Sequence, residues 1–136
     1  MIAHTLSVAA YLIVTFAVQA TNHFLVNTAH YARQSIMAAE PALIGGIASM
    51  LVQGIVLTFL YSRLRHAFPG VAGGVGFALL MGAFLGSYIA LAEPSKYLVT
   101  SLLEWFAVEA SASLIQFALF GLALGYIHKV VGHKTT

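Results

Sequence analysis

The chain has 136 residues, of which six are Lys or Arg and four are Asp or Glu, so that 7% carry a formal charge. Soluble domains carry about 25% charged residues, whereas 60% of this chain is hydrophobic and its mean hydropathy is +0.92. A small soluble domain buries only about 60–70% of its unfolded surface and could not hide so much apolar area. These values exclude a soluble globular domain and indicate that lipid surrounds most of the chain.

The few charges also limit the partners that the sequence predicts. The net charge is +2 and the pI is 9.1, but six dispersed Lys and Arg residues do not form the basic stripe of a nucleic-acid-binding surface. Anionic lipid headgroups are the natural partners of these charges. The chain has no Cys, which excludes disulfides and thiolate metal sites.

The first predicted helix spans residues 2–26, which is long enough to cross a hydrocarbon core of about 30 Å. A secretory signal peptide cleaved after Ala20 is the alternative interpretation. A signal peptide begins with a positively charged region, however, and residues 1–4 contain no Lys or Arg. The sequence therefore favours a helix that is retained.

Three further helices are predicted after a polar connection at residues 27–40. Pro41 suits the first turn of a helix because its missing N–H would be unpaired there. The predicted boundaries, which place the whole chain in one domain over residues 1–136, are 41–62, 68–92 and 97–128.

Connections of roughly 14, 6 and 4 residues between these helices are typical of an antiparallel up-down-up-down bundle. We therefore expect an all-α, polytopic four-helix transmembrane protein in which sequential helices pack together. Positive residues favour the cytoplasmic side. Four of them (Arg63, Arg65, Lys129, Lys134) lie at one side of the expected bundle and two (Arg33, Lys96) at the other, which predicts that both termini are cytoplasmic.

Small residues recur every four positions along the third predicted helix, and a shorter match occurs in the fourth. Such a ridge lets another helix backbone approach closely inside lipid, where packing replaces the hydrophobic driving force. The ridge predicts either helix packing within one bundle or an interface between subunits. Its members are Gly70, Gly74, Ala78, Gly82, Gly86 and Ala90, and the match is Gly121 and Gly125.

Acidic and imidazole side chains gather toward the outer half of the expected bundle. All four acidic residues are Glu (Glu40, Glu93, Glu104, Glu109). If the first helix continues, His23, Asn27 and His30 share one of its faces. Imidazoles and carboxylates near a membrane interface suit a divalent metal site or a proton relay. The candidate metal ligands are His23, His30, Glu104 and Glu109.

Depth in the bilayer separates two of these acids. We expect Glu104 to lie among the headgroups and to be solvated, whereas Glu109 lies deeper, where an ionised carboxylate costs roughly 2–3 kcal/mol. Glu109 should therefore be protonated, paired or turned inward. The sequence predicts an inward polar row of Glu109, Ser113, Gln116 and Gln53, which serves either as a structural hydrogen-bond network or as a binding or translocation site.

Several segments resemble a family of small bacterial four-helix membrane proteins of unknown function. The resemblance extends from His23 to about Ile127 and implies the four-helix fold and an inner-membrane location, but no activity. It is carried by His23-Phe24, Ser49-Met50-Leu51-Val52-Gln53-Gly54, Leu80-Met81-Gly82 through Ser87-Tyr88, Leu91-Ala92-Glu93, Trp105 through Glu109 and Gln116-Phe117.

Two functional hypotheses follow. The first is a structural or accessory subunit that docks through its glycine ridge onto a second copy or another membrane protein. The second is an oligomeric transporter or binding protein for a metal ion, a proton or a small solute. A membrane metalloenzyme is a more distant alternative, because the sequence shows neither a nucleophile–base pair nor an HExxH motif.

Overall fold

The computed structural model describes residues 1–34 and 42–131, and within these residues every regular element is helical. This confirms the predicted all-α class. The elements are α1 (Ile2–Thr21), the π-helical turn η1 (Asn22–Val26), α2 (Thr28–Ala32), α3 (Leu43–Leu64), α4 (Gly70–Ser87), the π-helical turn η2 (Tyr88–Ala92) and α5 (Leu102–Val131).

Four of the described helices are long and apolar enough to cross a membrane. They are Ile2–Val26, Leu43–Leu64, Gly70–Ala92 and Leu102–Val131, with lengths of 25, 22, 23 and 30 residues. Many of their large apolar side chains are exposed, as is expected where lipid replaces water as the solvent. The predicted start of the second helix at Pro41 lies outside the described residues.

The fourth long helix differs from its predicted bounds of 97–128 at both ends. The fourth long helix begins at Leu102 instead of residue 97, because Thr100 is held by Gln34 and the Ser101 hydroxyl accepts a hydrogen bond from the Glu104 N–H at 3.3 Å. It continues to Val131 instead of ending at residue 128. The predicted first connection also contains the short helix α2.

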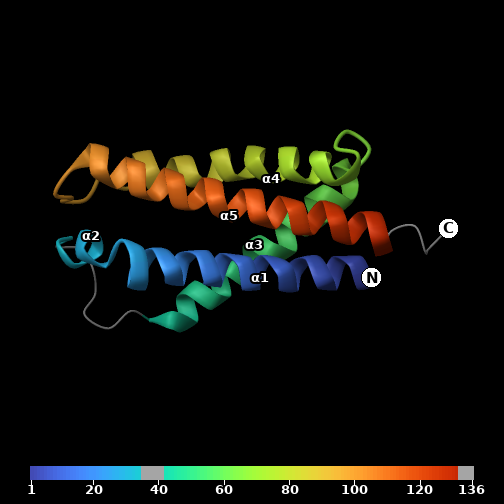
Figure 1. The fold of residues 1–136 in the computed structure, drawn as a ribbon, viewed down its shortest axis with the longest axis horizontal. Coiled ribbons are helices and arrows are strands. Elements are labelled where there is room, and N and C mark those ends of the chain that lie inside the picture. The colour runs from blue at the N-terminus through green and yellow to red at the C-terminus, as the bar shows by residue number, and fades with distance from the viewer. Residues whose placement is uncertain (35–41, 132–136) are drawn as a thin grey trace.

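The long helices lie side by side, but not every sequential pair is in contact along its length. Helix α1 packs against α3 and α5, and α5 packs against α4, whereas α3 and α4 contact each other little. Figure 1 shows the termini and the α3–α4 connection at one end of the molecule, and α2 with the η2–α5 connection at the other. The expectation that all sequential neighbours pack together was therefore wrong for α3 and α4.

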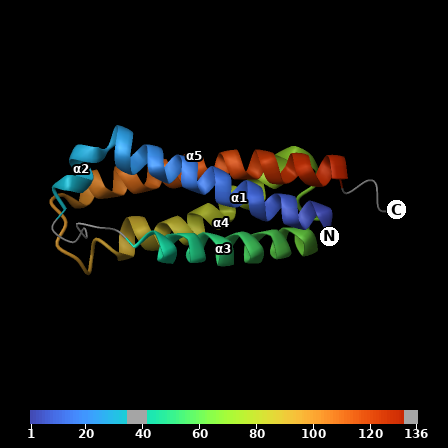
Figure 2. The same cartoon turned by 90° about the horizontal axis from the view of Figure 1, so that it is seen from below.

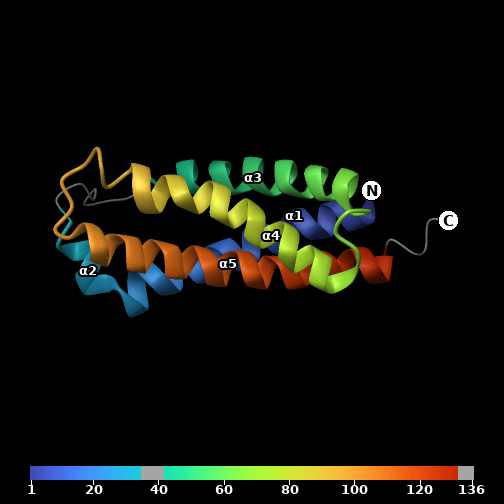
Figure 3. The same ribbon diagram turned by 90° about the horizontal axis from the view of Figure 1, so that it is seen from above.

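The oblique course of α3 explains this difference. Figure 1 shows α3 crossing behind α1, and Figures 2 and 3 show α4 passing from the level of α3 at the α2 end to the level of α5 at the other end. Near the termini the two helices are joined by a short connection. Toward the α2 end the first half of α3 and the second half of α4 diverge, so the bundle opens between them.

The predicted glycine ridge of α4 faces α5 of the same chain. A Cβ added at Gly74 would lie 2.6 Å from the Gly125 Cα, and one added at Gly121 would lie 2.6 Å from the Val75 Cα. Only glycine permits two helix backbones to approach this closely. The other ridge members are placed differently: Gly82 lies on Phe117, Gly86 on Ser113, Ala78 beside Gly121, Ala90 is buried, and Gly70 starts α4 with a φ of +67°.

Candidate functional site: a polar cleft between α3 and α4

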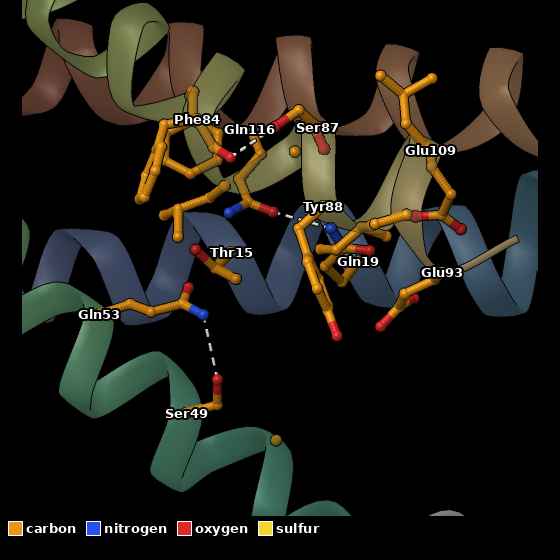
Figure 4. Close-up of a pocket in the computed structure, with 18 of the residues that line it drawn as sticks. Thr15, Gln19, Ser49, Gln53, Phe84, Ser87, Tyr88, Glu93, Glu109 and Gln116 are labelled. Atoms are coloured by element: carbon orange, nitrogen blue, oxygen red, sulfur yellow. Dashed lines mark hydrogen bonds between the residues drawn. The ribbon is translucent and has the colours of Figure 1, made fainter. Parts of the chain in front are cut away.

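A cleft of about 1340 Å³ occupies the space where α3 and α4 diverge. Figure 4 shows that polar side chains from all four long helices reach into this space, among them Gln19, Gln53, Gln116 and Glu109. Apolar residues such as Phe84 complete its walls. The cleft thus combines an apolar lining with convergent polar groups, which is typical of sites for small molecules.

The inner part of the cleft is organised by the fully buried Tyr11 of α1. The Tyr11 hydroxyl donates a hydrogen bond to Gln53 of α3 at 2.5 Å and accepts one from Gln116 of α5 at 3.5 Å. Gln116 also accepts a hydrogen bond from Gln19 at 2.9 Å, and Gln53 donates one to Ser49 at 3.1 Å. These bonds tie α1, α3 and α5 together across the apolar interior.

The outer part of the cleft is built around Glu109 of α5, which is only 6% exposed. The Tyr31 hydroxyl donates to Glu109 Oε1 at 2.6 Å, and it accepts a hydrogen bond from Asn22 at 2.7 Å. Asn22 in turn accepts a hydrogen bond from Asn27 at 2.6 Å. Burial raises the pKa of Tyr31 far above its ordinary value, so its hydroxyl stays protonated and remains a donor.

The mouth of the cleft is formed by the turn after η2. Tyr88, Glu93 and Tyr97 line this part, and the Lys96 ammonium lies 5.1 Å from the centre of the Tyr88 ring. Burial raises the pKa of Glu93, and the nearby Lys96 only partly offsets this effect. The mouth therefore already places one cation of the chain over an aromatic face.

Glu104 lies outside the cleft and is half exposed. It accepts a hydrogen bond from Arg33, and its carboxylate lies 3.2 Å from the Nδ1 of the buried His30. This group fixes α2 against the start of α5. Glu104 is therefore solvent-accessible as expected, but it is also paired.

The four candidate metal ligands are divided between separate places. His23 stacks on Tyr31 at a ring separation of 3.7 Å, while His30 contacts Glu104 and Glu109 binds Tyr31. Among residues 1–34 and 42–131, no group of three or more His, Cys, Asp or Glu residues is arranged to hold a metal ion.

The helix break at Asn27 accounts for this division. Asn27 has a φ of −110° and a ψ of 26°, which interrupts the helix before α2 begins. The first helix therefore does not continue through Asn27, and His23, Asn27 and His30 do not share one helix face. Glu40, which the sequence grouped with the other acids, lies outside the described residues.

The structure brings together the polar row that the sequence singled out. Glu109, Ser113, Gln116 and Gln53 all line the same cleft. Sequence reasoning missed several of their neighbours. Gln19 and Asn22 are polar residues in an apolar helix, so the criterion that identified Gln53 would also have found them, whereas Tyr11 and Tyr31 gave no such signal. Glu93, which the sequence grouped with the other acids and not with this row, also lines the cleft.

Comparison of the chain with protein-family models, with curated proteins and with solved structures finds no match. The resemblance to a four-helix family therefore remains an expectation from the sequence, and the functional argument depends on the geometry of the cleft.

Proposed function

We propose that this chain is an integral membrane protein that binds a small solute in the cleft between α3 and α4. Four apolar helices of sufficient length support a multi-pass, up-down-up-down arrangement in the bilayer. Arg63 and Arg65 lie at the end of α3, and Lys129 lies at the end of α5. Under the positive-inside rule this supports cytoplasmic termini, in the bacterial inner membrane that the family resemblance implies.

The observation that carries the proposal is the convergence of polar groups on an open space inside an apolar bundle. Polar side chains at membrane depth are costly and are retained where they pair or line a cavity. A purely structural network would pack its members together, whereas Glu109, Gln116 and Gln53 surround a volume of about 1340 Å³. The typical ligand pocket has a volume of about 300–1000 Å³, so this cleft has room for a solute of that size.

The alternative of an accessory subunit has less support from the geometry. That hypothesis used the glycine ridge of α4 as its docking surface. Gly74 lies against the backbone of Gly125 and Gly82 lies against Phe117, so α5 of the same chain already occupies the ridge.

Two adjacent glycines of α3 provide the test. A Cβ at Gly45 or at Gly46 would have no other atom within 4 Å, but only Gly46 lines the cleft. Gly46→Phe should therefore place a phenyl ring inside the cleft and obstruct binding there, while Gly45→Phe should add a similar side chain outside it. Native mass spectrometry of the wild type and both variants, released from nanodiscs of their own membrane, would report small molecules that co-purify.

We expect a bound small molecule in the wild type and in Gly45→Phe, and its loss in Gly46→Phe. Equal occupancy in all three proteins would contradict binding in the cleft, and so would a wild type without any bound molecule. Circular dichroism and thermal unfolding of each variant would establish that both remain folded.

A further inference from the structure

We propose that the cleft selects an organic cation with an apolar body, held by the carboxylates of Glu93 and Glu109 and by aromatic rings at the cleft mouth. This inference rests on the proposed function, because it names the chemical class of the solute for the same cleft. The supporting features are the charge of the lining, its aromatic rings and its large apolar area.

The Asp, Glu, Lys and Arg residues that line the described part of the cleft are all acidic. Glu93 and Glu109 both line the cleft, and the described part of its wall contains no Lys or Arg. Figure 4 shows both side chains reaching into it, Glu109 from α5 and Glu93 from the turn after η2. Among residues 1–34 and 42–131, the neutral Tyr31 hydroxyl is the hydrogen-bond donor to the Glu109 carboxylate. In a medium of low dielectric constant, a cation is the partner that complements these two acids.

The aromatic rings supply a second contact suited to a cation. Tyr88, Tyr97 and Trp105 line the cleft together with Phe84. The negative face of such rings attracts ammonium and related groups within about 6 Å of the ring centre. The chain itself shows this preference, because the Lys96 ammonium lies 5.1 Å from the Tyr88 ring centre. An entering cation would compete with Lys96 for that ring.

The remaining lining suits an apolar body better than a bare ion. Phe84, Leu85, Leu91, Met50 and Phe117 form much of the wall. A small inorganic cation needs a close shell of oxygen ligands, whereas the described residues offer no compact cluster of three acidic or imidazole groups. An organic cation uses both parts of the lining, because its charge lies near the carboxylates and its hydrocarbon contacts the apolar wall.

The chain carries its own reporter for the test. Trp105 is the only tryptophan in the sequence, and it lines the cleft with its Nε1–H donated to the Ile89 carbonyl at 3.0 Å. The full-length protein in lipid nanodiscs would be titrated with tetraphenylphosphonium, with the anion tetraphenylborate and with neutral triphenylphosphine oxide. Trp105 emission and equilibrium dialysis would measure binding, with empty nanodiscs correcting for partition into lipid.

We expect tetraphenylphosphonium to bind and the anion and the neutral compound to bind at least about tenfold more weakly. Glu109→Gln keeps an oxygen that accepts the Tyr31 hydrogen bond but removes the charge, so it should weaken cation binding about tenfold. Glu104→Gln is the matched control, because it makes the same change on the same helix at a residue outside the cleft. It should leave cation binding unchanged.

Lys96→Gln tests the same inference in the opposite direction. Removal of the competing ammonium should tighten tetraphenylphosphonium binding by about two- to fivefold. Arg63→Gln is its control, because Arg63 makes a comparable contact with Phe59 at the other end of the molecule, 5.2 Å from the ring centre. The expected result for Lys96→Gln is a gain of affinity, which a misfolded protein would not show.

The outcomes separate this inference from the proposed function. Equal binding of the three probes, or unchanged cation binding in Glu109→Gln, would overturn the assignment to cations. If Gly46→Phe still removed a co-purifying molecule, the cleft would remain a binding site for another class of solute. If Gly46→Phe removed nothing, the proposed function itself would fail.

Discussion

Helix α4 makes two very different contacts along its length. Near the termini its backbone touches that of α5, with Gly74 against Gly125. Toward α2 it diverges from α3 (Figure 1), and the cleft lies between them. Small residues allow close approach at the first contact, whereas polar and aromatic side chains line the space at the second.

The contrast shows how a short chain can combine a close contact between two helices with an open cleft. Inside lipid, helices associate through close packing and hydrogen bonds instead of hydrophobic burial. The α4–α5 contact provides the packing. The hydrogen bonds of Tyr11 hold α3 to α1 and α5, so α3 stays attached although it leaves α4. Each of the following predictions concerns a change either at the α4–α5 contact or at the cleft.

The largest expected effect is at the glycine contact. In Gly74→Leu the new Cβ would lie within 2.8 Å of backbone atoms of Gly125 and Gly121, which cannot move independently. We expect the free energy of unfolding in bicelles to fall by about 3 kcal/mol or more. Gly45→Leu is the control, since its Cβ meets no atom within 4 Å. Unchanged unfolding combined with dissociation of an oligomer would contradict the intrachain contact and restore the subunit interface.

A smaller effect is expected from Tyr11→Phe on the cleft side. This change keeps the ring but leaves the Gln53 carbonyl oxygen without its donor. The free energy of unfolding should fall by about 1 kcal/mol. Tyr126→Phe removes a hydroxyl from a residue that is 62% exposed and should have no measurable effect. If the two variants were equally stable, the inner hydrogen-bond network would not hold α3 in place.

The smallest effect should appear in the pH dependence of stability. Burial raises the pKa of Glu93 above its ordinary value of 4.5, so the folded state favours the protonated form. This contribution is fully present below the pKa of the unfolded chain, and it is lost as the pH rises through the higher folded pKa. The wild type should therefore lose stability over this range relative to Glu93→Gln. Parallel pH profiles of the two proteins would contradict the burial of Glu93.

Much of the fold could be predicted because long apolar helices leave a simple pattern in the sequence. Uninterrupted apolar stretches give the long helices, and small residues at every fourth position reveal the α4 ridge. The start of α5 was missed because hydropathy continues through Leu98 and Val99, whereas the helix begins only after Ser101, whose hydroxyl binds the Glu104 N–H. A local capping interaction, which hydropathy does not report, sets this boundary.

The site could be predicted only in part, for a related reason. Gln53, Gln116 and Glu109 stand out as polar residues in apolar helices, and the structure places them around one cleft. Their partner Tyr11 was missed because a tyrosine in an apolar helix is common, and the sequence does not specify how α1 is rotated. The prediction that His23 and His30 share one helix face was wrong because a single non-helical residue, Asn27, interrupts the helix between them.

The two π-helical turns have a further consequence for how this protein can vary. In η1 the Asn27 N–H reaches back five residues to the Asn22 carbonyl, and in η2 the Glu93 N–H reaches the Tyr88 carbonyl. Such a turn accommodates one residue more than an α-helical turn. A gene variant that lost a single codon within residues 88–92 would exchange the π-helical turn for an α-helical one, so that Glu93 and Lys96 would keep their direction relative to α4. The loss of one residue here is therefore expected to leave Glu93 on the wall of the cleft.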